Sequence, residues 1–243
     1  FDDNSFLTGG NGVLDPTTPA RGGNGELVNV VIAIISNSGA DVTFRTDYWT
    51  FTRGPLVPDF RRLIDDFESG VAPGTPCTPE ATLNFCTFAG GGSSVALSNP
   101  TTPPAPVLPA VGTPNSVLQL DLNVTSFAGF IRGFEVSGVP APQDWSTSEG
   151  FSLWFYGTGS GTAMFIDILD NRNPGSTVDD AERYRVDFID DFTGWQQLVF
   201  PFSSFNRFEV GNSAPNDGFG RFEVHGWAIG ALGTDGPRTY YVD

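Results

Sequence analysis

Acidic side chains gather at three places in this chain, and they are the residues best suited to chemistry. A DDFE motif lies at Asp65–Glu68, a DDAERY motif at Asp179–Tyr184, and the sequence ends in TYYVD at Asp243. Carboxylates can act as an acid and base pair on a glycosidic bond, bind sugar hydroxyls or ligate a cation. Spacing does not show two carboxylates at catalytic separation, and abundant acids are usually a solvated surface. A glycosidase stays open as an alternative, but binding without catalysis is favoured.

Nucleophilic catalysis is not indicated by the sequence. The chain has a single histidine, His225, and no serine lies in a Gly-x-Ser-x-Gly motif of the kind that exposes a nucleophile on a strand-to-helix turn. We therefore assign no catalytic residue.

Two cysteines, Cys77 and Cys86, flank the eight-residue segment TPEATLNF. So short a separation in a turn-rich region favours an intramolecular disulfide in an oxidising compartment, which would contribute roughly 2 to 3 kcal/mol on the chain-entropy estimate. Two free thiols are the alternative. A zinc site would need further Cys or His ligands, and only one His is present.

The net charge excludes several classes of partner. It is −16, with 12 arginines and no lysine, so the surface would repel both phosphate backbones and anionic lipid head groups. No apolar run approaches the roughly 18 residues of a membrane span. We expect no nucleic-acid or membrane partner. Because the chain opens at Phe1 without Met or a signal peptide, we interpret it as a processed chain or a piece of a longer one.

Short alternating segments must position these residues. The stretch after DDAERY contains two of them, Tyr184–Phe188 and Gln196–Phe202, joined by a turn at Asp-Phe-Thr-Gly, each with large apolar residues alternating with polar ones. Thirty Gly and 19 Pro break the chain at short intervals. This pattern predicts an all-β protein, a jelly-roll β-sandwich. Its further strands are expected at Ser94–Ser98, Val117–Val124, Gly129–Val136, Gly150–Tyr156, Ala163–Asp170, Phe222–Ile229 and Thr239–Val242.

Three parts are expected along the chain. Residues 1–53 form a β-rich segment with a hairpin, residues 54–62 a linker, and residues 63–243 the sandwich. The hairpin is similar in order to the segment around VHGWAIGAL and RTYYVD, so residues 1–53 are either the tail of a preceding sandwich or an ordinary hairpin. Asn99–Asn115, with six prolines, is expected to be a surface loop.

The sandwich sequence contains DDFE, the GW and PFSSF run, VHGW and the final YYVD. Through these motifs it resembles family 11 carbohydrate-binding modules and the broader galactose-binding-like sandwiches. The resemblance covers about Leu63 to Asp243. It implies a non-catalytic module of a secreted bacterial glycoside hydrolase or surface protein, with a cleft for a polysaccharide such as β-glucan. A structural alternative is a sandwich repeat of an extracellular filament or surface array, formed by self-assembly or with other domains of a longer chain.

Position by position, the resemblance implies a set of ligand-binding residues. They are Phe88, Phe127, Asp180, Arg183, Arg207 and His225. Phe88 and Phe127 replace family tyrosines, which keeps the ring faces but removes the hydroxyl groups, and Arg183 replaces a histidine. Sugars are bound by aromatic faces and by charged or polar groups that bond their hydroxyls. Five of the six also have a structural alternative: the two rings as core, Asp180 and Arg183 as an exposed ion pair, and His225 in a hydrogen-bond network inside the sandwich.

Sandwiches of this type often join their first and last strands through a hard cation. The resemblance therefore implies a structural calcium ion, Ca2+, with Asp66, Glu68 and Asp243 as ligands. Acidic strand ends are also common on an acidic protein, so a metal-free surface is the alternative.

Overall fold

The computed structural model describes the backbone of residues 30–38, 41–49, 63–71, 74–78, 83–102, 104 and 115–243. The chain divides into two compact units, Phe1–Phe60 and Arg61–Asp243. In the first, β1 (Val30–Ser38) pairs antiparallel with β2 (Asp41–Trp49), which is the hairpin expected within residues 1–53. All of the candidate residues lie in the second unit.

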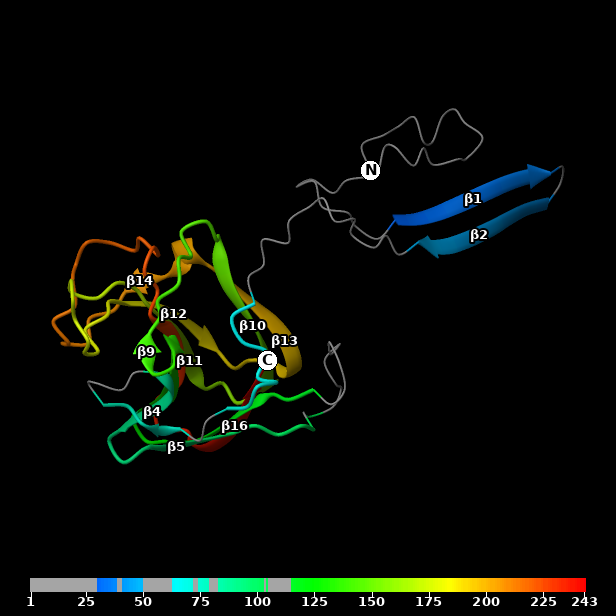
Figure 1. The fold of residues 1–243 in the computed structure, drawn as a ribbon. Helices are drawn as coiled ribbons and strands as arrows, with labels where there is room; N and C mark the ends of the chain where they lie inside the picture. Colours follow the sequence, from blue (N-terminus) through cyan, green and yellow to red (C-terminus); the bar gives the residue numbers. More distant parts are fainter. Residues whose placement is uncertain are drawn as a thin grey trace. The chain divides into compact units, whose positions relative to one another are not determined.

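The second unit is an all-β sandwich of two main sheets (Figure 1). The five-stranded sheet has the order β13 (Thr193–Pro201), β10 (Gly150–Thr158), β16 (Gly236–Val242), β6 (Leu118–Val124) and β5 (Ser94–Ser98). The seven-stranded sheet has the order β14 (Asn206–Arg207), β12 (Arg183–Ile189), β11 (Ala163–Leu169), β15 (Gly226–Leu232), β7 (Phe127–Gly133), β4 (Asn84–Gly90) and β3 (Thr75–Pro76). A small ribbon, β8 (Glu135–Val136) with β9 (Val139–Pro140), and a 3₁₀ turn, η1 (Phe202–Ser204), complete it. The predicted fold class is confirmed.

Apolar side chains fill the space between the two sheets because each strand turns alternate residues inward. On β6 the inward residues Leu118, Leu120 and Leu122 are buried, and the intervening residues are partly exposed. Phenylalanine supplies much of this core; Phe130 on β7 and Phe155 on β10 are both fully buried. One face of each sheet is thereby occupied, and only the outer faces can offer side chains to a ligand.

Successive strands cross between the sheets at several turns. β12 and β13 are joined by residues 190–192, because Thr193 and Gly194 of the predicted Asp-Phe-Thr-Gly turn belong to β13. These two strands lie in opposite sheets, and so do β15 and β16. The terminal segment therefore differs in pairing from the β1–β2 hairpin that it resembles in sequence, because a sandwich places consecutive strands on either side of its core. Within the described part of the chain, no helix has the length and apolarity of a membrane span.

Asp190 fixes the turn between β12 and β13. Its carboxylate, which is fully buried, accepts hydrogen bonds from the backbone N–H groups of Thr158, Gly159 and Ser160 and from the hydroxyls of Thr158 and Ser160. Although burial raises the pKa of Asp190, these hydrogen bonds outweigh it and lower the pKa below its usual value. The charged carboxylate thus ties this turn to the end of β10.

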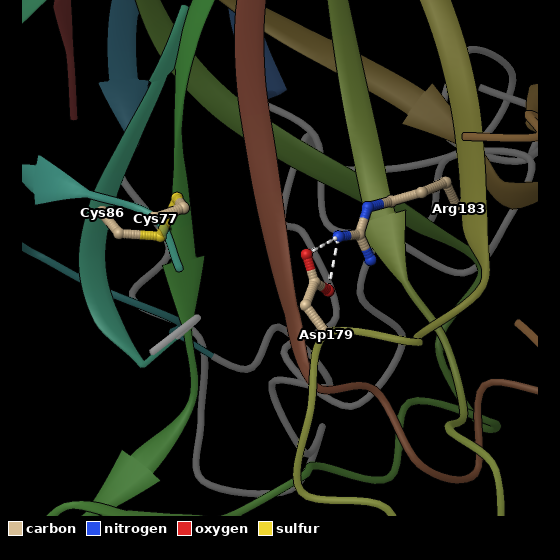
Figure 2. The surroundings of a disulfide bond; sticks show 4 residues. All are labelled: Cys77, Cys86, Asp179 and Arg183. Atoms are coloured by element: carbon tan, nitrogen blue, oxygen red, sulfur yellow. Dashed lines mark hydrogen bonds and ion pairs between the residues drawn. A yellow bond between two sulfur atoms is a disulfide. The ribbon is translucent and has the colours of Figure 1, made fainter. Parts of the chain in front are cut away.

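Cys77 and Cys86 form the predicted disulfide (Figure 2). Cys86 lies on β4, and Cys77 directly follows β3, where its backbone N–H donates to the carbonyl oxygen of Thr87 at 2.8 Å. The bond holds the short parallel strand β3, at the edge of the seven-stranded sheet, to its neighbour β4.

Candidate functional site

The outer face of the seven-stranded sheet carries a set of polar and aromatic side chains. On β11, Phe165 and Asp167 point away from the core that Ile166 enters. On β12, the same alternation turns Arg185 and Asp187 outward, and strand register places Asp187 opposite Phe165 and Arg185 opposite Asp167. Neighbouring strands therefore contribute side chains to one surface.

Four aromatic rings and one guanidinium group form a ladder across this face. The aromatic ladder consists, in order, of Phe127, Phe88, Phe165, Arg185 and Phe208. Ring centroids are 6.4 Å apart between Phe127 and Phe88 and 6.2 Å apart between Phe88 and Phe165. The guanidinium carbon of Arg185 lies 3.7 Å from the ring centroid of Phe165 and 3.6 Å from that of Phe208. Both ends of the ladder, Phe127 and Phe208, are 40% exposed, whereas Phe165 at its centre is 2% exposed.

Two glycines under the ladder allow its central rings to lie against the sheet. Gly129 and Gly230 are cross-strand neighbours on β7 and β15. A Cβ atom at Gly129 would lie 2.7 Å from the ring of Phe88 and 2.3 Å from the carbonyl oxygen of Ile229, and one at Gly230 would lie 2.6 Å from the ring of Phe165. Any side chain at these positions would displace the rings, so the ladder depends on both glycines.

An ion pair holds Arg185 between its two rings. Its Nε and Nη2 atoms donate to the two carboxylate oxygens of Asp167 at 2.6 and 2.7 Å. Asp167 is 4% exposed, and burial raises the pKa of its carboxyl group while the hydrogen bonds and charge of Arg185 oppose this shift. The bidentate geometry fixes the plane of the guanidinium group. Arg185 therefore presents a rigid, planar cation within the ladder.

A pocket of about 280 Å³ opens beside the Arg185 end of the ladder. Asp187, Asn206 and Arg207 line it together with Phe208. Arg207 donates to the carboxylate of Glu182 at 3.0 Å, so its guanidinium group is held in place. Carboxylate, amide and guanidinium groups next to an exposed ring are the groups that bind sugar hydroxyls and C–H faces.

Asp180, Arg183 and His225 are each 6% exposed. Asp180 Oδ2 accepts a hydrogen bond from Asn173 Nδ2 at 2.7 Å. Arg183 Nη2 donates to both carboxylate oxygens of Asp179 at 2.6 and 2.7 Å, as Figure 2 shows. Arg183 is thus held by an internal ion pair, whereas Asp180 Oδ1 is buried and has no hydrogen-bond partner. Direct contact with a ligand stays a prediction for Asp180, Arg183 and His225.

His225 contacts the exposed carboxylate of Glu223, with 3.0 Å between Nε2 and Oε1. Burial and the positive charge of Arg172 lower the pKa of His225, and Glu223 opposes the shift. The imidazole is therefore neutral at pH 7. Of the six predicted ligand-binding residues, Phe88 and Phe127 lie together in the ladder and Arg207 lines the adjacent pocket. The other three, Asp180, Arg183 and His225, are buried.

The predicted calcium ligands lie around the start of β6. Asn115 Nδ2 donates to Asp243 Oδ2 at 3.1 Å, and the backbone N–H of Ser116 donates to Glu68 Oε1 at 2.7 Å. Burial raises the pKa of Asp243, and the nearby negative charges of Glu68 and Asp66 raise it further, while Asn115 opposes the shift. Among the described residues, no three acidic, His or Cys side chains converge as they stand to enclose an ion. Backbone oxygens or waters would have to complete such a site.

A comparison with known protein families identifies the family of this sandwich. A family model described as a carbohydrate binding domain (family 11) matches residues 50–221, which is more than half of the chain. The chain belongs to carbohydrate-binding family 11. The resemblance stated from the sequence is thus confirmed, and the protein contains a carbohydrate-binding module.

Solved structures of family 11 share the fold of this module. One, from Clostridium thermocellum in complex with a β-1,3-1,4-mixed-linked tetrasaccharide, has a TM-score of 0.53 and 17% identity, covering 74% of this chain and 90% of that chain. The module of the cellulosomal cellulase Lic26A-Cel5E from the same organism has a TM-score of 0.52 and 15% identity, covering 75% and 90%. A comparison with curated proteins finds no match.

Sequence reasoning missed several residues of the face. Phe165, Arg185, Asp187 and Phe208 were not among the predicted ligand-binding residues. The alternation in RYRVDF on β12 already distinguishes outward Arg185 and Asp187 from inward Tyr184, so this signal was available in the sequence. Phe208 gave no such signal, because its position depends on how the segment after β14 folds back on the sheet.

Proposed function

We propose that this module binds a β-glucan along the aromatic ladder on the outer face of the seven-stranded sheet. The observation that carries the proposal is the ladder itself: its two ends, Phe127 and Phe208, are each 40% exposed, and a fixed guanidinium group lies beside Phe208. Aromatic faces pack against the C–H surface of a pyranose, and each such contact contributes about 0.5 to 1.5 kcal/mol beyond burial.

Polar groups beside Phe208 supply the directional part of recognition. In the proposed complex, Asp187 accepts hydrogen bonds from sugar hydroxyls, and Asn206 and Arg207 donate to them. Asp187 and Asn206 are exposed, and Arg207 is partly exposed, so the three are accessible without rearrangement. The binding residues that we assign are therefore Phe88, Phe127 and Arg207, the accessible members of the predicted set. Asp187, Asn206 and Phe208 are added to them. Asp180, Arg183 and His225 then act by holding the adjoining loop.

The solved family member whose complex contains a β-1,3-1,4-linked tetrasaccharide supports β-glucan as the ligand class. The cellulosomal origin of another supports a secreted bacterial polysaccharide-degrading enzyme as the parent protein. In that setting the module contributes binding and no bond cleavage. Because phenylalanines replace family tyrosines at Phe88 and Phe127, recognition at this end depends on ring contact without a hydroxyl hydrogen bond, and selectivity among glucans is set mainly at the Arg207 end.

We also propose that a calcium ion joins the start of the sandwich sequence to its last strand, through Asp66, Glu68 and Asp243. Burial, together with the nearby negative charges of Glu68 and Asp66, raises the pKa of Asp243, and this supports the proposal because a cation would stabilise the charged carboxylates. All three donors are carboxylate oxygens, the ligands that Ca2+ prefers. The ion would stabilise the fold and takes no part in sugar recognition.

A polysaccharide screen tests the proposed ligand class. Native affinity electrophoresis in gels containing mixed-linkage β-glucan, xyloglucan, mannan or starch should show retardation by the β-glucan. The chain migrating equally in all four gels and in a gel without polysaccharide would contradict the proposal. Retardation only by mannan or starch would refute the ligand class while leaving a sugar-binding face.

A further inference from the structure

A second group of aromatic side chains lies on the opposite side of the sandwich. It occupies the outer face of the five-stranded sheet, where Trp154 and Tyr156 on β10 flank the fully buried Phe155, with Trp195 on β13 and Tyr241 on β16 beside them. All four outward rings are partly exposed. We call these four residues the tryptophan–tyrosine patch.

Three rings of the patch form a row across adjacent strands. Strand register places Trp195 opposite Tyr156 and Tyr156 opposite Tyr241. Their ring centroids are 5.5 and 5.9 Å apart, with the central ring nearly perpendicular to both neighbours at interplanar angles of 76° and 89°. Edge-to-face contacts of this kind are favourable, so the row is preformed. A preformed surface loses little conformational entropy when it binds a ligand.

The residue types in the patch differ from those elsewhere in the sandwich. The chain contains 22 Phe but only five Trp and five Tyr, and phenylalanine supplies most of the aromatic rings of the core and every ring of the aromatic ladder. By contrast, each ring of the patch carries an indole N–H or a hydroxyl group. Such rings suit a surface at which an apolar face meets a ligand and a polar atom meets water or a hydroxyl. The patch therefore has the side-chain chemistry of a sugar-binding surface.

Uncharged polar groups and two acidic residues, Asp121 and Asp243, border the patch. The backbone of Asp243 exchanges two hydrogen bonds with that of Trp154, at 2.7 and 2.9 Å. Gln119 lies opposite Tyr241 on β6, and its amide donates to Asp121 Oδ2 at 2.8 Å, while the hydroxyl of Thr239 donates to Asp121 Oδ1 at 2.6 Å. On the other side, exposed Gln197 lies opposite Trp154. Amide, hydroxyl and carboxylate groups around aromatic faces suit a neutral polyol and disfavour an anion.

At the β13 edge, the indole Nε1 of Trp195 donates to the carbonyl oxygen of Pro104 at 3.0 Å. This contact bounds the patch on one side and satisfies the indole N–H. Trp154, Tyr156 and Tyr241 lie on the β10 and β16 side of that boundary, where a ligand can reach them.

We propose that the tryptophan–tyrosine patch is a second carbohydrate-binding surface, which takes a neutral β-linked polysaccharide. Its ligand class rests on the proposed function, but it uses no residue of the aromatic ladder. Sugar rings stack on Trp154 and Tyr241, and Gln119 and Gln197 bond their hydroxyls. With binding surfaces on opposite sheets, one module holds two polysaccharide chains.

Tryptophan fluorescence separates the two surfaces. In the described part of the chain, the aromatic ladder contains no Trp, and Trp145 and Trp227 are in the core at 4% and 3% exposure. In a Trp49→Phe background, which removes the remaining tryptophan, we expect a mixed-linkage β-glucan oligosaccharide to protect the emission from acrylamide quenching. Protection should persist in Phe127→Ala, which alters the ladder only. The apparent affinity of the oligosaccharide, taken from the concentration dependence of protection, should fall at least tenfold in Tyr241→Ala and in Trp154→Ala. Circular dichroism should confirm that each variant is folded.

Each outcome decides between the surfaces. One combination of results would overturn the second surface and leave the ladder proposal intact. In it, β-glucan retards the protein in gels but does not change the acrylamide quenching, and Tyr241→Ala binds like the unmodified protein. Loss of all binding in Tyr241→Ala with no effect of Phe127→Ala would refute the ladder and support the patch. Protection by a proline-rich peptide but not by glucan would also overturn the proposal. Tyr241→Phe, which keeps the ring and is the variant least able to disturb folding, should lose less affinity than Tyr241→Ala.

Discussion

Replacing Arg185 with leucine tests whether the ion pair between Arg185 and Asp167, near the Phe208 end of the aromatic ladder, stabilises the folded protein. Arg185→Leu keeps an aliphatic side chain between Phe165 and Phe208 but removes both hydrogen bonds to Asp167, at 2.6 and 2.7 Å. The Asp167 carboxylate, 4% exposed, is then buried without its partner. Breaking a buried pair in this way costs about 3 to 5 kcal/mol. At roughly 2 to 4 °C per kcal/mol for a domain of this size, the melting temperature should fall by about 6 to 20 °C.

A double-mutant cycle isolates the pair. Asp167→Val in the Arg185→Leu background removes the stranded charge, so the double variant should regain most of the lost stability. Glu209→Gln is the matched control because Glu209 is 58% exposed and pairs with Arg207 at the surface. The loss of an exposed ion pair should leave the melting temperature nearly unchanged. Thermal and urea unfolding are measured for the unmodified protein, Arg185→Leu, Asp167→Val, the double variant and the control. A single variant as stable as the control, or a double variant destabilised by the sum of the singles, would refute the reasoning.

Three further predictions follow from the disulfide, the proposed calcium site and Asp190. Intact-mass measurement should show a 2 Da gain on reduction, with stability falling by about 2 to 3 kcal/mol when the Cys77–Cys86 bond is opened; thiol labelling of the unreduced, denatured protein would contradict it. Calcium at about a hundred times its dissociation constant should add about 2.7 kcal/mol relative to chelator and should not do so in Glu68→Gln; identical melting in both buffers would remove the ion. Because the pKa of Asp190 is lowered in the folded state, the stabilisation of the fold by the charged carboxylate is present above the unfolded pKa of about 4 and is lost as pH falls through the folded pKa. In Asp190→Asn the loss of stability on acidification should be smaller. An unchanged acid limb of the pH–stability curve in that variant would count against this role of Asp190.

Much of the fold could be predicted because strand alternation and turn residues are local signals. Ser94–Ser98 was predicted with its observed bounds, and the long strands from β6 to β16 were placed within about four residues, whereas the two-residue strands β9 and β14 were not predicted. β4 was missed because NFCTFAG has no simple alternation: both of its faces are largely buried, one by the core and the other by the disulfide region. Which sheet each strand joins could not be predicted, since β12 and β13 look like a hairpin until their partners are known.

The site was less predictable because it depends on burial. Phe88 and Phe127 were recognised from the family resemblance, and the structure places them side by side. Asp180 and Arg183 are polar and lie in a motif, yet the loop before β12 covers them, and only tertiary structure shows that Asp179 is the partner of Arg183. The outward rings Trp154 and Tyr156 carry no motif at all, and their role emerges only from the register of three strands.

Isothermal titration of mixed-linkage β-glucan into Phe127→Ala tests the central claim most directly. The ring is 40% exposed at the open end of the ladder, so its removal should weaken binding by about 1 to 2 kcal/mol, or about 5- to 30-fold, while stability barely changes. Phe222→Ala is the matched control, because that ring is 73% exposed and lies outside both the ladder and the patch. The account predicts weaker binding at the ladder in Phe127→Ala and unchanged binding in Phe222→Ala; equal affinities in the two variants would contradict it.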